Sequence, residues 1–143
     1  MLTPLSPLPL LAHCGLEKTP TPAILVFEIV AIALSLLTLG LLTRLGDRLW
    51  LRAAIMAIGV LLFELFTAPL WNNERLGVWA YLYLDVSWIL TLIWTAMILA
   101  VVMGVDRWRA AWPAWQRFLL YMALLIVGVG LLEVVVVNLP ILS

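Results

Sequence analysis

Four long apolar stretches, separated by short polar segments, make up most of this chain. Each stretch has about 20 mostly apolar residues, the length that an α-helix needs to cross a hydrocarbon core of about 30 Å. None of them alternates between apolar and polar residues with the period of two that is typical of a barrel strand. The pattern predicts an all-α, polytopic membrane protein, an antiparallel bundle of four transmembrane helices at about 22–43, 50–71, 79–104 and 116–139.

The composition supports a membrane protein and limits the other classes. Of the 143 residues, 66% are hydrophobic and only 11% are charged, unlike the average soluble domain. Because the connecting segments are short, we expect one bundle over 22–139, an N-terminal tail over 1–21 and a C-terminal tail over 140–143. The net charge is zero and the basic residues are spread out, so no nucleic-acid binding is predicted. The single cysteine excludes an internal disulfide.

The arginines predict which helix ends face the cytoplasm. Most of the basic residues lie in or next to the segments 44–49 and 105–115, namely Arg44, Arg48, Arg52, Arg107, Arg109 and Arg117. Short loops rich in arginine stay on the cytoplasmic side, so both tails are expected outside. Tryptophans concentrate at membrane interfaces, and most of those in this chain lie near the predicted inner or outer ends of the helices. The predicted location is a bacterial inner membrane or an equivalent membrane, with N-out and C-out topology.

Each predicted helix carries one acidic residue close to its outer end. Because the helices alternate in direction, the acids all lie six or seven residues from that end, about 9–10 Å deep at 1.5 Å per residue. The four acids are Glu28, Glu64, Asp85 and Glu133. Ionised carboxylates are costly in hydrocarbon, so four of them at one depth predict a functional site in the outer part of the bundle.

Two kinds of binding site would use this arrangement. The four carboxylates would hold a hard divalent cation as a cofactor, with supporting amide oxygens from Asn72, Asn73 and Asn138. Protonated carboxyl groups would instead relay protons. Either site fits a transport or energy-coupling subunit, which is the first functional hypothesis. The structural alternative is that each protonated acid only bonds to a neighbouring helix.

A membrane enzyme is the second hypothesis. A buried carboxylic acid can protonate an alkene of an apolar lipid or isoprenoid, and a second carboxylate can take a proton back. Asp85 is the expected acid and Glu64 is its expected partner. On a helix, Tyr81 and Trp88 share the face of Asp85, where their rings would line a pocket and stabilise a carbocation.

The run Leu62–Phe66, the run Gly77–Tyr81 and the acid Asp85 together resemble the small membrane lycopene cyclase domains. Those domains pair an acid in one helix with acids at the start of the next. The resemblance implies isoprenoid chemistry at Glu64 and Asp85. The proline and paired glutamates of that family are replaced here by the run Tyr83–Val86.

The third hypothesis is an accessory structural subunit of a larger membrane complex. Short loops and tryptophan-rich helices are compatible with it. The expected partners are the lipid bilayer, further copies of the chain or other subunits, and an apolar lipid ligand if the protein is an enzyme. The sequence leaves open whether the chain is an enzyme, a transporter or a subunit.

Overall fold

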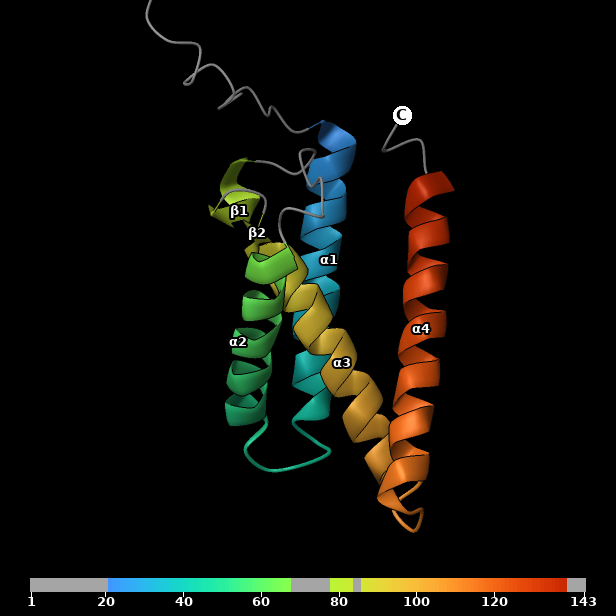
Figure 1. Cartoon of the computed structure of the whole chain (residues 1–143). Coiled ribbons are helices and arrows are strands. Elements are labelled where there is room, and N and C mark those ends of the chain that lie inside the picture. The colour runs from blue at the N-terminus through green and yellow to red at the C-terminus, as the bar shows by residue number, and fades with distance from the viewer. Residues whose placement is uncertain (1–20, 68–77, 84–85, 139–143) are drawn as a thin grey trace, which may run out of the picture.

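The computed structural model describes residues 21–67, 78–83 and 86–138, apart from the side chains at 78, 132, 133 and 135–138. Four long helices dominate it (Figure 1), namely α1 (Pro22–Leu42), α2 (Leu49–Thr67), α3 (Trp88–Trp108) and α4 (Ala114–Asn138). A 3₁₀ turn, η3 (Val78–Ala80), and two short strands, β1 (Tyr81–Tyr83) and β2 (Val86–Ser87), precede α3. All four helices are long and apolar enough to cross a membrane, which confirms the all-α fold and indicates an integral membrane protein.

The start of α1 follows from its own sequence. The side chain of Thr21 accepts a hydrogen bond of 3.3 Å from the backbone N–H of Ile24, which satisfies one of the free donors at the helix end. Pro22 occupies the first helical position, where its missing N–H costs no hydrogen bond.

The bundle has two distinct ends. The beginning of α1, the β1–β2 pair and the end of α4 lie at one end, here named the hairpin end (Figure 1). The segments 43–48 and 109–113 connect helices at the opposite end, here named the turn end (Figure 1). The four helices therefore alternate in direction, as predicted.

The central helix is α3, which crosses the bundle obliquely and packs against α1, α2 and α4 (Figure 1). An apolar core joins it to α1 and α2 and consists of Leu39, Leu42, Leu49, Ala53, Ala96, Leu99 and Met103. Small residues such as Ala53 and Ala96 let the helix backbones approach closely.

The fourth helix is attached differently. It packs mainly against α3 near the turn end, and the two helices separate toward the hairpin end because α3 runs obliquely (Figure 1). None of its described side chains is buried. The structure therefore consists of a packed three-helix unit with α4 held against one side.

The predicted third helix, 79–104, is wrong at its start. The segment before Trp88 forms η3 and an antiparallel strand pair in which Tyr81 lies opposite Ser87. Two contacts between Trp79 and Trp88 close this hairpin. The Trp88 ring nitrogen donates a hydrogen bond to the Trp79 carbonyl at 2.9 Å, and the two rings pack edge to face with their centres 5.4 Å apart. Tyrosine and valine favour strands, and hydropathy alone does not distinguish an apolar strand from an apolar helix.

The other predicted bounds agree more closely. The first helix begins at the predicted residue 22, the second begins one residue before 50, and the fourth begins two residues before 116. The third helix ends at Trp108 rather than at 104. The tails 1–20 and 139–143 and the segment 68–77 lie outside the described residues.

The hydrogen bond that closes the hairpin can be tested by removing its donor. Replacing Trp88 with phenylalanine keeps an aromatic ring against Trp79 but loses the bond to the Trp79 carbonyl. We expect the free energy of unfolding to fall by about 1 kcal/mol, measured by thermal unfolding in detergent. Trp50→Phe is the control because that exposed ring has no such hydrogen bond within the described part of the chain. Equal stability of the two variants would argue against a stabilising hairpin.

Candidate functional site

A cluster of polar side chains lies between α2 and the start of α3. The Thr91 Oγ1 is 2.9 Å from the Glu64 Oε2 and 3.0 Å from the Ser87 carbonyl oxygen. Thr91 is buried, and Glu64 is half-buried near the end of α2. One hydroxyl group thus connects a carboxyl group on α2 to the backbone at the beginning of α3.

This geometry links the protonation state of Glu64 to the orientation of the Thr91 hydroxyl group. A hydroxyl group has one hydrogen, and the Ser87 carbonyl oxygen can only accept. If Thr91 donates to that carbonyl, its contact with Glu64 is a hydrogen bond only when the carboxyl group is protonated and donates to Thr91. If Glu64 is ionised, Thr91 must donate to Glu64 and leaves the Ser87 carbonyl. The two states of Glu64 therefore require two orientations of the same hydroxyl group.

The polar face of α3 continues for one further turn. Thr91 and Thr95 are four residues apart, which places them on one face of α3, and the buried Ser87 immediately precedes this helix. The Ser87 Oγ, the Thr95 Oγ1 and the second oxygen of Glu64 are covered, and none has a hydrogen-bond partner among the described atoms. Beyond Thr95 the buried side chains of α3 are apolar, beginning with Ala96 and Leu99. The polar face therefore ends inside the bundle.

Glu28 lies on α1, which packs against α3. Its side chain is fully buried (0% exposed) on the face of α1 that also buries Ser35 and Leu39. Glu28 is near the beginning of α1, and Glu64 is near the end of α2, so both acids lie in the hairpin-end half of the bundle.

Of the four predicted acids, the structure places the side chains of Glu28 and Glu64 only. Asp85, Asn72 and Asn73 lie outside the described residues, and so do the side chains of Glu133 and Asn138 on α4. Within the described ranges, no three acidic, histidine or cysteine side chains gather closely enough to hold a metal ion. Convergence of all four acids, and a metal site built from them, stay predictions.

The residues predicted for an enzyme pocket have a different local setting from the one expected. Tyr81 lies on β1, and Trp88 begins α3 with its ring against Trp79. The helical spacing that related both rings to Asp85 does not apply, because α3 starts only at Trp88. Acid–base catalysis by Asp85 and Glu64 stays a prediction.

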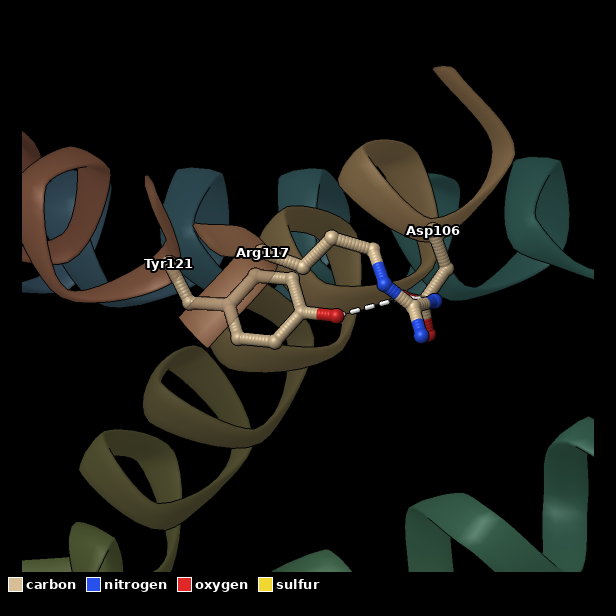
Figure 2. Close-up of polar contacts among 3 residues, drawn as sticks. All are labelled: Asp106, Arg117 and Tyr121. Carbon is tan, nitrogen blue, oxygen red and sulfur yellow. Dashed lines mark hydrogen bonds and ion pairs between the residues drawn. The ribbon is translucent and has the colours of Figure 1, made fainter. Parts of the chain in front are cut away.

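A second polar cluster, at the turn end, joins α3 to α4 (Figure 2). The Asp106 Oδ1 lies 2.7 Å from an Arg117 terminal nitrogen and accepts a hydrogen bond from the Tyr121 hydroxyl. Arg117 and Tyr121 are four residues apart, so they share one face of α4. This cluster was not predicted from the sequence, where the arginines indicated only the orientation of the helices. The signal was present as one acid, Asp106, among three arginines.

Comparison with known proteins gives no match to a protein-family model, to a characterised protein or to a solved structure. The resemblance to lycopene cyclase domains therefore has no support from a family match. Functional argument for this chain depends on its own residues.

Proposed function

We propose that this protein is a transport or energy-coupling subunit that binds protons at Glu64 in the outer half of the membrane. The observation that carries the proposal is the position of the Thr91 hydroxyl between the Glu64 carboxyl group and the Ser87 carbonyl. In this proposal the hairpin end and both tails face outside. The segments 44–49 and 105–115 face the cytoplasm, in a bacterial inner membrane or an equivalent membrane.

A proton is the simplest way to neutralise Glu64. The described arginines lie at the turn end of the bundle or close to it, far along the helices from Glu64. Carboxyl groups in a membrane that have no basic partner are stable when they are protonated or when they bind a cation. The distances around Thr91 are hydrogen-bond distances, so the Glu64 carboxyl group and the Ser87 carbonyl both lie within reach of its one hydroxyl group.

The Thr91 hydroxyl would couple protonation to the start of α3. When Glu64 carries a proton, it donates to Thr91, and Thr91 donates to the Ser87 carbonyl. When the proton leaves, Thr91 turns toward the carboxylate, and the carbonyl loses this bond. Because Ser87 is the residue that precedes α3, each proton bound or released changes the hydrogen bonding at that helix end.

The end of the polar face supports coupling rather than conduction. Ser87, Thr91 and Thr95 lead inward from the hairpin end, and apolar core residues follow them on α3. A single chain therefore offers a proton a binding site in its hairpin-end half. Transport across the membrane would need further copies of this chain or another subunit.

Replacing Glu64 with glutamine tests the proposal, because glutamine keeps the shape of the side chain but does not ionise. We expect the variant to bind one proton fewer per chain in a pH titration and to lose the infrared band of a protonated carboxyl group. Thr91→Val, which removes the hydroxyl, should move that band, whereas Thr91→Ser should leave it almost unchanged. Thr38→Val on α1 is the matched control and should have no effect.

Unchanged proton binding and an unchanged infrared band in Glu64→Gln would refute proton binding at Glu64. A titration that changes only when a divalent cation is added would instead support the cation site.

An accessory subunit of a larger membrane complex is the second candidate function. It is favoured by α4, which packs mainly against α3 and buries none of its described side chains. A transmembrane helix with one neighbour has free surface for a partner helix. If this candidate is correct, the protein purified alone in detergent will self-associate or lose α4 packing, whereas a stable, monodisperse monomer would count against it.

A further inference from the structure

We propose that the turn between α3 and α4 binds the phosphodiester group of an anionic phospholipid through Arg109. This site lies at the turn end of the bundle and does not depend on the proton-binding function proposed for Glu64.

The geometry around Arg109 holds its side chain in place. The guanidinium carbon lies 3.7 Å from the centre of the Trp108 ring and 4.5 Å from the centre of the Trp112 ring. The backbone is held on both sides, because the Arg109 N–H donates to the Val105 carbonyl at 2.7 Å and the Trp112 N–H donates to the Arg109 carbonyl at 2.9 Å. A guanidinium group held against two aromatic rings loses little freedom when it binds a ligand.

The charge of Arg109 is available to a ligand. Asp106, the acid in this region, already pairs with Arg117. Within the described part of the chain, no carboxylate forms an ion pair with Arg107 or Arg109. Ring stacking uses the flat face of a guanidinium group, while its N–H donors point outward in the plane of the group. The Nε of Arg109 is covered, so a phosphate would bind through the terminal nitrogens.

The location favours a lipid as the source of the phosphate. Trp108 and Trp115 are largely exposed, and Trp112 is partly exposed. Tryptophan rings at the end of a transmembrane helix lie at the level of the lipid headgroups. Basic groups at this depth meet phosphodiesters, and each adds about 1 kcal/mol of attraction to an anionic membrane surface.

The turn between α1 and α2 provides an internal comparison. With the adjacent helix ends it holds Arg44, Arg48, Arg52 and Asp47, and the turn between α3 and α4 with its adjacent helix ends holds Arg107, Arg109, Arg117 and Asp106. Three arginines and one aspartate give each region the same formal charge of +2. Among the described residues, only the second region stacks an arginine on tryptophan rings. Charge alone therefore predicts equal lipid binding at the two turns, whereas the geometry predicts a preference for Arg109.

The experiment is native mass spectrometry of the full-length protein in detergent, titrated with phosphatidylglycerol and, separately, with phosphatidylcholine. We expect Arg109→Gln to weaken the apparent affinity for phosphatidylglycerol by about tenfold, since its charge-assisted hydrogen bonds to the phosphodiester are lost. The matched variant Arg44→Gln removes the same charge from the other turn and should weaken it by less than about twofold, because an exposed charge without a bound partner contributes little in detergent. Arg109→Lys, which keeps the charge but loses the planar fork, should lie between the wild type and Arg109→Gln.

Equal losses in Arg109→Gln and Arg44→Gln would overturn the proposal, because general attraction to a positive surface would then explain the binding. Equal binding of phosphatidylcholine and phosphatidylglycerol would overturn it as well. Displacement of the lipid by inorganic phosphate at similar concentration would identify a soluble anion rather than a lipid as the ligand. Unchanged circular dichroism in both variants is the check that the helices remain folded.

Discussion

Replacing Asp106 with alanine is expected to lower the free energy of unfolding by about 2 kcal/mol and to release α4 from α3 at the turn end. The Asp106 carboxylate accepts hydrogen bonds from both Arg117 and Tyr121, and these contacts are the described polar links between the two helices. Without it, Arg117 keeps a positive charge that has lost its partner. Because the side chains of Arg117 and Asp106 are 28% and 45% exposed, solvent screens part of the ion pair and keeps the expected loss moderate.

Two measurements distinguish this loss from a general effect of removing an acid. Thermal unfolding in detergent gives the change in stability, and hydrogen–deuterium exchange reports whether the amides at the beginning of α4 become less protected. Asp47→Ala is the matched control, since Asp47 is an exposed aspartate in the other turn. Tyr121→Phe removes only one of the two links and should cost about 1 kcal/mol. If Asp106→Ala and Asp47→Ala behave alike, the cluster does not hold α4.

The second large effect is expected from filling the space between α2 and its neighbours. Ala53 is 7% exposed and belongs to the core that joins α1, α2 and α3. Replacing it with phenylalanine forces the helices apart and is expected to cost about 3 kcal/mol, the upper end of the range for overpacked cores. The measured result would be a lower unfolding temperature and a broader peak in size-exclusion chromatography.

The adjacent residue provides the control for this prediction. Ala54 lies next to Ala53 but is exposed on the outer side of α2. Ala54→Phe adds the same ring to a surface that faces lipid, where an apolar side chain is tolerated. Nearly unchanged stability is expected for this variant. A similar loss for both variants would mean that the buried face of α2 is assigned incorrectly.

The candidate site was partly predictable because the positions of its acids are visible in the sequence of each helix. A single acid in an apolar stretch is visible in the sequence, and alternating helix directions place Glu28 and Glu64 in the same half of the bundle. The partner of Glu64 was not predictable in this way. Thr91 is one of two hydroxyl residues on α3, and only the rotation of α2 relative to α3 brings its Oγ1 to 2.9 Å from the carboxyl group.

The start of α3 shows a different limit. Residues 78–87 are mostly apolar and run directly into the apolar helix that follows, so hydropathy extended the helix over them. The contact between Trp79 and Trp88, nine residues apart, favours a hairpin instead. Such a contact depends on how the chain folds back on itself. Hydropathy averaged over a window of residues does not reveal it.

The sequence by itself determined the membrane class, the four apolar helices and their alternating directions, because length and hydropathy are properties of each segment alone. Only the tertiary structure decided that α3 is central, that α4 is held through Asp106, and that Thr91 bridges Glu64 to the start of α3. These features depend on the rotation and crossing of helices that are apolar on nearly every side, and such helices carry little information in their sequence about which face meets which partner.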